Sequence, residues 1–366
     1  MGLRSFLASL VLAAVASCGG GSTGGDPDGS VADARTIDCG TDGGVPSELA
    51  CTGLYRDWET RALADGVYEF KPGFELWSDG ANKRRWILLP PGTTIDATDM
   101  NEWTFPVGTK LWKEFQVQVG GTLRPVETRM LWKRDEFEWQ RTTYVWSDDL
   151  KRAVEVTDGV EDFAGTGYEV PSRARCARCH GGRKDGVLGF EAVLLAAPEA
   201  TGLTYASLVN NGWLTTATNT GLPAAAALQV PGNQGERSAL GTLHVNCGIS
   251  CHNPGHPEHP LQLRLEIGNE GVGKLENTSA FTTAMNMGTD FKPEGADEQR
   301  TYYLIIPTKP EQSMVYYRMG KRDFADPESK EQMPPLSTRK VDQAGLKIVG
   351  DWIRNMNGPP YPPPVE

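Results

Sequence analysis

Hydrophobic and polar positions alternate along the N-terminal half of the chain. Between about residues 55 and 170, β-branched and aromatic residues recur in partial alternation, and turn signals such as "KPG", "PPGTT" and "VGGT" interrupt them. The segments with this pattern are "FELWSDG", "KRRWILLP", "KLWKEFQVQV", "TLRPVETRMLWKR" and "FEWQRTTYVWS". Short strands at this spacing predict an antiparallel β-sandwich or barrel over residues 37–170, with most of the tryptophans in its core.

The pattern becomes helical in the second half of the chain. "PSRARCARCHG" predicts a short helix that begins after Ser172, and "GERSALGTLHVNCGISCHNPGH" predicts a longer one. A last helix is expected over residues 341–356, where apolar and small residues recur at helical spacing. We therefore expect a mainly α-helical domain over residues 171–358, followed by a Pro-rich tail over residues 359–366. The predicted fold class is α+β with two domains.

The first 18 residues predict a secretory signal. Arg4 supplies a basic start, residues 6–16 form an apolar run too short to span a membrane, and small residues follow. The stretch "VASC" resembles a lipobox, which would make Cys18 the lipidated first residue; ordinary cleavage after Ala16 is the alternative. Residues 19–36 are rich in Gly, Ser and Asp and predict a flexible tether. We expect an exported protein, periplasmic or on the cell surface, with a lipid anchor in the outer membrane.

Export changes what the seven cysteines can do, because disulfides persist outside the cytosol. Cys39 and Cys51 bracket a turn-rich loop, and we expect them to form a disulfide worth about 2–4 kcal/mol of stability. The other four thiols after Cys18 form two pairs, each followed by a histidine. The net charge of −11 argues against nucleic acid as a partner and suits a basic partner protein.

The first pair stands in "CARCH", which contains Cys176, Cys179 and His180. In an exported protein, C-x-x-C-H is the attachment signal for haem c. Its two thiols match the separation of the porphyrin vinyl groups, and the adjacent imidazole reaches the iron. A zinc site is the alternative, since paired cysteines also supply thiolates. A thioredoxin-like redox pair is disfavoured because no βαβ pattern surrounds the motif.

The second pair stands in "CGISCH", which contains Cys247, Cys251 and His252 and is one residue longer. It keeps Cys251 and His252 adjacent, which the geometry at iron constrains most tightly. Only the loop between the two thiols becomes longer. We expect a second haem at this motif, and a Cys247–Cys251 disulfide is the alternative.

The sixth ligand of a covalently bound haem iron is most often Met or His. Neither occurs between Gly181 and Leu243, so the first haem takes its ligand from farther along the chain, with His244 as candidate, or stays five-coordinate. For the second haem we favour Met333, because prolines fix its loop in "EQMPPLS". The other candidates are Met285, Met287, Met314 and Met319.

Six motifs follow one another along residues 66–355: "ELWSDGANKRRWILLP", "FPVGTKLWKEF", "ETRMLWKR", "VPSRARCARCHG", "NCGISCHNPG" and "QMPPLSTRKVDQAGLKIVGDWI". Together they resemble a family of exported bacterial cytochrome c-like lipoproteins. The resemblance implies an N-terminal β domain and a C-terminal cytochrome c-like domain with one or two haem c groups. It also implies thioethers at both cysteine pairs, and iron ligation by His180, His252 and Met333.

These observations predict an electron carrier rather than a catalyst, in which haem iron transfers one electron at a time. Two alternatives stay open. A haem enzyme of the peroxidase or oxidase type would use an open iron face at the first haem. A binding lipoprotein without haem would use the cysteines as structural disulfides. The expected partners are a redox protein and, through the anchor, a membrane.

Overall fold

The computed structural model describes residues 37, 39, 44–217, 221–323 and 330–356. The chain divides into two units, Met1–Asp38 and Cys39–Glu366, and the fold below is that of the second unit. The predicted signal, the predicted lipidation site Cys18, the predicted tether and the Pro-rich tail lie outside the described residues. No helix in the described part of the chain is long and apolar enough to cross a membrane.

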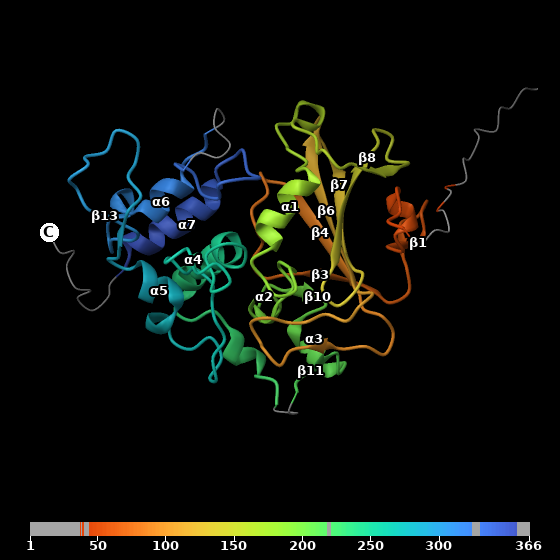
Figure 1. The fold of residues 1–366 in the computed structure, drawn as a ribbon, viewed down its shortest axis with the longest axis horizontal. Helices are drawn as coiled ribbons and strands as arrows, with labels where there is room; N and C mark the ends of the chain where they lie inside the picture. The colour runs from red at the N-terminus through yellow and green to blue at the C-terminus, as the bar shows by residue number, and fades with distance from the viewer. Residues whose placement is uncertain (1–36, 38, 40–43, 218–220, 324–329, 357–366) are drawn as a thin grey trace, which may run out of the picture. The chain divides into compact units, whose positions relative to one another are not determined.

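A seven-stranded antiparallel sheet is the largest element (Figure 1). Its strands, in spatial order, are β10 (Thr201–Gly202), β3 (Val67–Lys71), β4 (Asn82–Leu88), β6 (Lys110–Val119), β7 (Thr122–Lys133), β8 (Trp139–Trp146) and β9 (Ala153–Glu155). The central strands are long because β-branched and aromatic residues recur along both of their faces. Three two-stranded ladders join β1 (Tyr55–Asp57) to β2 (Ala62–Leu63), β5 (Ile95–Asp96) to β11 (Leu214–Thr215), and β12 (Gly288–Thr289) to β13 (Tyr302–Tyr303).

Different parts of the chain cover the two faces of the large sheet. One face carries a cluster of buried aromatic residues that includes Trp86, Trp112 and Tyr144, and the segment around Leu49 covers it. The opposite face packs against α2 (Ala192–Ala196) and α3 (Tyr205–Asn210) through a second cluster, which includes Phe70, Ile87, Leu111, Phe190, Leu195, Tyr205 and Leu208. Since side chains alternate along a strand, each central strand contributes to both clusters.

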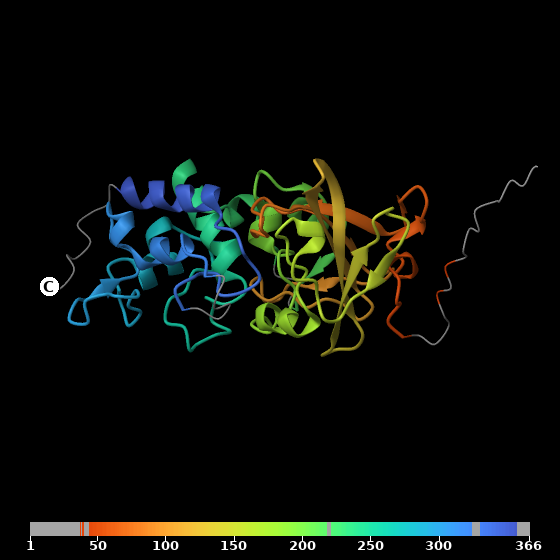
Figure 2. The same cartoon turned by 90° about the horizontal axis from the view of Figure 1, so that it is seen from above.

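The C-terminal helices surround a separate core. α4 (Gln234–Leu243) packs against α7 (Gln343–Arg354), and α6 (Met314–Met319) contacts α7 (Figure 2). A capping box formed by Asn233 and Glu236 begins α4. The remaining helices of the described residues are α1 (Arg173–His180), α5 (Ser279–Ala284), a π-helical turn at His244–Gly248 and five 3₁₀ turns at Leu49–Cys51, Phe163–Gly165, Ala225–Leu228, Leu275–Asn277 and Pro310–Gln312.

The predicted fold class is wrong. Only 24% of the structure is helical, in seven helices among the described residues, so the C-terminal half is not mainly α-helical. Prolines account for part of this difference: Pro254, Pro257 and Pro260 keep their segment out of a helix, because proline lacks the N–H that a helix interior needs. The N-terminal strands form one open sheet, since its edge strands β10 and β9 do not pair with each other to close a barrel.

The expected strand "FELWSDG" is an irregular segment between β3 and β4. Its N–H groups and side chains bond to distant parts of the chain instead of to a neighbouring strand. The N–H of Trp77 donates to the side-chain oxygen of Asn246, and the carboxylate of Asp79 accepts from the N–H groups of Arg339 and Lys340. These bonds place the segment beside the C-terminal part of the chain.

The expected disulfide between Cys39 and Cys51 is confirmed. Cys51 ends the first 3₁₀ turn, and Leu49 in that turn is fully buried in the aromatic cluster on one face of the sheet. The disulfide therefore ties the start of the second unit to the segment that covers this face.

Replacing Asp185 by alanine is expected to lower the free energy of unfolding by about 3–5 kcal/mol. Its carboxylate lies 2.7 Å from Nζ of Lys133 and 2.8 Å from Nε1 of Trp139, and the Lys133 side chain is only 1% exposed. The substitution leaves the lysine charge buried without its partner. Urea titration measures the change. Asp148→Ala is the control, expected to stay within about 0.5 kcal/mol, because the Asp148 side chain is 97% exposed. A loss below about 1 kcal/mol in Asp185→Ala would contradict this account of the buried pair.

Candidate functional site

Two adjoining pockets contain the two cysteine motifs. The first includes His180 and has about 1550 Å³ of unfilled space, part of it open to solvent. The second includes His252 and has about 730 Å³. Apolar side chains form most of both linings, which is the character of a cofactor site.

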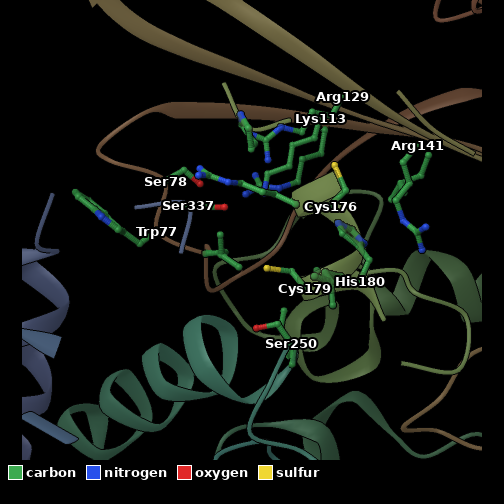
Figure 3. A pocket seen from close by; sticks show the side chains of 18 of the residues that line it. Trp77, Ser78, Lys113, Arg129, Arg141, Cys176, Cys179, His180, Ser250 and Ser337 are labelled. Carbon is green, nitrogen blue, oxygen red and sulfur yellow. The ribbon is translucent and has the colours of Figure 1, made fainter. Parts of the chain in front are cut away.

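Helix α1 places the first motif against the sheet, where the helix packs on β8. Ser172 precedes the helix with extended backbone, which confirms the predicted start, although its side chain makes no capping hydrogen bond. Cys176 and Cys179 lie three positions apart in the helix and therefore on the same face. Both cysteines and His180 line the first pocket (Figure 3).

The imidazole of His180 is held in one tautomer. Its Nδ1 lies 2.5 Å from the carbonyl oxygen of Gly186, and because a carbonyl only accepts, Nδ1 carries the proton. Burial lowers the pKa of His180 to about 4, so the ring is neutral at physiological pH. A neutral ring protonated at Nδ1 has its lone pair on Nε2, which is the form that binds a metal.

A π-helical turn leads into the second motif, and a further wide turn accommodates its extra residue. The π-helical turn spans His244–Gly248 and continues directly from α4. The N–H of His252 donates to the carbonyl oxygen of Cys247, five residues earlier, at 2.9 Å. In an α-helix such as α1 this bond joins residues four apart, which is the spacing from the first cysteine to the histidine in C-x-x-C-H. The wider turn therefore restores the hydrogen-bonded relation that the shorter motif has in a regular helix.

His252 repeats the arrangement of His180. Its Nδ1 donates to the carbonyl oxygen of Leu261 at 3.0 Å, and burial lowers the pKa of the ring to about 4. Gly248 is needed nearby, since a Cβ there would lie 2.6 Å from the main chain of Arg264. Both motifs thus present a neutral imidazole with an available Nε2 beside an apolar pocket.

The four motif cysteines are free thiols. Burial raises the pKa of Cys179 to about 11 and that of Cys247 to about 12. Buried, protonated thiols are unsuited to a reactive redox pair. Within the described residues, no three side chains of His, Cys, Asp or Glu converge to hold a bare metal ion. The structure therefore supports neither the zinc alternative nor a Cys247–Cys251 disulfide.

The methionine candidates for the second iron divide into two groups. Met333 lines the second pocket, together with Met314 and Met319 of α6. Met285 is buried in the C-terminal core, and Met287 is largely exposed outside the lining. The pocket therefore brings Met333 together with Cys247, Cys251 and His252, residues that lie far from it in the sequence.

The structure gives His244 a different role from the distal ligand that the sequence suggested. Its Nε2 donates to the carboxylate of Glu191 at 2.7 Å, and its Nδ1 accepts from the N–H of Leu265 at 3.0 Å. Both ring nitrogens are occupied, and the ring is fully buried outside both pockets. His244 therefore cannot bind iron in this structure, because it joins the end of α4 to two other segments.

The two pockets share one wall. Five residues line both of them: Cys179, Asn246, Ser250, Pro334 and Leu336. The end of α1 also packs tightly on the loop after the second motif, since a Cβ at Gly182 would lie 2.2 Å from Nε2 of His256. The fold therefore holds the two motifs next to each other, although about seventy residues separate them.

Several lining residues carry charge that the sequence did not connect with the motifs. Lys113 (β6), Arg129 (β7) and Arg141 (β8) project from neighbouring strands into the first pocket (Figure 3). In the sequence, each of these residues is a polar position within a predicted strand. Only the pairing of the strands shows that they lie on the same face, beside His180.

Known proteins add no information to the geometry of the two pockets. Comparisons of the chain with family models, with curated proteins and with solved structures find no match. The resemblance to cytochrome c-like lipoproteins stays a prediction, and the site itself must support any function.

We expect the stability of the haem-free protein to fall as the pH is lowered from about 6.5 to 4. In this range the unfolded chain protonates His180 and His252, whose pKa values are about 4 in the folded state against 6.5 for a free imidazole. Proton uptake by the unfolded chain then favours unfolding. Urea midpoints at pH 7 and pH 5 measure the effect in protein made without haem-attachment enzymes.

Substitution of either buried imidazole should weaken this pH dependence. His180→Gln and His252→Gln are the informative variants, and His259→Gln is the control because its side chain is 47% exposed. If both variants retain the full difference between the two pH values, the neutral, buried state of these rings is refuted.

Proposed function

We propose that this protein is an exported c-type cytochrome in which two covalently attached haem groups transfer single electrons. One observation carries the proposal: each cysteine motif lines an apolar pocket, together with a histidine whose Nδ1 is bonded to a main-chain carbonyl. The haem iron would supply the chemistry by accepting and releasing one electron.

The residues of both pockets fit this group. Cys176 and Cys179 would form the thioethers of the first haem and His180 would bind its iron. The corresponding residues at the second pocket are Cys247, Cys251 and His252. The bond from Nδ1 to a carbonyl orients each imidazole and makes it a stronger ligand. Apolar lining residues would exclude water from a haem held there, which is one of the means by which proteins set a haem potential.

The shared wall supports electron exchange within the protein. Because Cys179, Asn246 and Ser250 line both pockets, groups bound in them would be separated by little more than side chains. An electron could then pass from one haem to the other without a long path through protein. The donor or acceptor would be a second redox protein, and the acidic net charge of −11 suits a basic surface on it. An exported location with a lipid anchor belongs to the same proposal.

Haem stoichiometry tests the proposal directly. In protein matured in a periplasm, we expect two covalent haems per chain by pyridine haemochrome and by intact mass after denaturation. Cys176→Ala with Cys179→Ala should remove one haem, and Cys247→Ala with Cys251→Ala should remove the other. One haem in the wild-type protein would restrict the site to one motif, and none would refute the proposal.

A cysteine pair outside the pockets provides the matched control. Cys39→Ser with Cys51→Ser removes the disulfide and should lower stability by about 2–4 kcal/mol. The haem count should stay at two, because neither residue lines a pocket. A parallel loss of haem in this control would show that the counts follow folding rather than attachment.

Met333→Ala is expected to remove the sixth ligand of the second haem. The iron should change from low to high spin, and its reduction potential should fall, because Met ligation raises the potential of a haem. Optical spectra and a redox titration measure both effects. Met319→Leu is the control, since Met319 lines the same pocket. A spin change in Met319→Leu but not in Met333→Ala would assign the ligand to α6 instead.

One observation favours a second candidate, a haem enzyme of the peroxidase or oxidase type. The described lining of the first pocket includes no imidazole besides His180. Its one methionine, Met130, belongs to the aromatic cluster on the other face of the sheet. The first iron would therefore have no Met or His as sixth ligand and could bind a molecule from solution. Two low-spin, six-coordinate haems would exclude this candidate.

A further inference from the structure

A patch of positive side chains crosses the sheet at the first pocket. Arg85, Lys113 and Arg129 are direct cross-strand partners on β4, β6 and β7, and Arg141 lies nearby on β8. All four line the pocket, and we call them the cationic patch. Like charges directly opposite one another destabilise a sheet, so this arrangement requires negative charge close by.

Acidic side chains supply only part of that charge. Glu75 lies 2.9 Å from Arg85, and Glu127 binds Arg129 through two hydrogen bonds. Lys113 and Arg141 make no ion pair within the described residues, and Nε of Arg141 is buried without an acceptor. Two of the four cations, Lys113 and Arg141, therefore line the pocket without an anionic partner among the described residues.

The other acids of the lining are already engaged. Asp79 accepts from two main-chain N–H groups of the C-terminal segment. Glu169 forms ion pairs with Arg175 and Arg339. Burial and the neighbouring Arg85 hold the pKa of Lys113 well below its usual range, so its charge is unfavourable until an anion lies beside it.

We propose that Lys113, Arg129 and Arg141 form a binding site for a small anion in the first pocket, where it can reach the iron of the first haem. The inference rests on the proposed haem function and adds a ligand class to it. Charged hydrogen bonds from Lys and Arg favour an anion over a neutral molecule of similar size. The missing Met or His ligand leaves a coordination position for it.

Haem propionates are the other source of negative charge, and one observation disfavours them. Figure 3 shows Lys113 and Arg129 on the side of the pocket where Cys176 lies. The thiols attach to the vinyl edge of a porphyrin, and the propionates extend from the opposite edge.

Optical titration of the oxidised protein tests the site, with azide as the anionic probe and imidazole as a neutral one. Haem content is measured first, so that loss of the cofactor is recognised separately. We expect azide to bind one of two haems, and to bind still when Cys247 and Cys251 are alanine. Lys113→Gln and Arg141→Gln should each weaken azide binding about tenfold, as expected for one charged hydrogen bond, and change imidazole binding less than about twofold.

Lys110→Gln is the matched control, because it removes a charge from the same strand outside the first pocket. It should leave both affinities unchanged.

Failure of azide to bind a protein with two haems would overturn the anion site and leave the proposed function standing. Equal weakening of both probes would show altered access rather than charge recognition. A shifted reduction potential with unchanged azide affinity would identify the cations as propionate partners. Absence of haem would overturn the proposed function and this inference together.

Discussion

The position of one proton on each of two imidazole rings decides what the cysteine motifs can do. At His180 the carbonyl oxygen of Gly186 fixes that proton on Nδ1, and at His252 the carbonyl oxygen of Leu261 does so. A ring protonated on Nε2 would turn a donor toward the pocket and could not bind a metal. The two loops that carry these carbonyls are therefore as important for the site as the histidines.

Each loop is held in place by contacts with other parts of the chain. Asp185 precedes Gly186 and is fixed by Lys133, Trp139 and the N–H of Phe105. A buried ion pair thus sets the position of the carbonyl beside it. At the second site the N–H of Leu263 donates to the carbonyl of His252. This bond holds the loop with the Leu261 carbonyl beside the histidine that the carbonyl orients. The pockets depend on these supports before any cofactor is considered.

The sequence predicted local features better than their assembly. The alternating segment "KLWKEFQVQV" forms β6, and the segment with helical spacing that ends at Arg354 forms α7. Both elements could be predicted because their patterns depend only on residues that are close in the chain. The disulfide between Cys39 and Cys51 followed from their short separation. The helical content of the C-terminal half was overpredicted, since a few periodic segments say little about the long connections between them.

The parts of the site that sequence reasoning missed all depend on distant partners. No local pattern shows that Lys113 and Arg141 face His180, because strand pairing alone brings them to one pocket. "FELWSDG" has the composition of a strand, but its bonds to the C-terminal part of the chain outweigh that preference. The extra residue in "CGISCH" left the function of this motif open, and the wide turn from Cys247 to His252 became visible only from its hydrogen bond.

The bonds from Asp79 to the segment before α7 have a consequence for the order of folding. They join positions 260 residues apart, and residues from both segments form walls of the first pocket. Contacts of such high sequence separation form after local elements, since the entropy of closing the intervening chain must be overcome first. Helix α1, by contrast, involves only eight residues. A bulky group attached to its thiols would be in place before these walls close, and the chain could then fold around it as it does around any large apolar side chain.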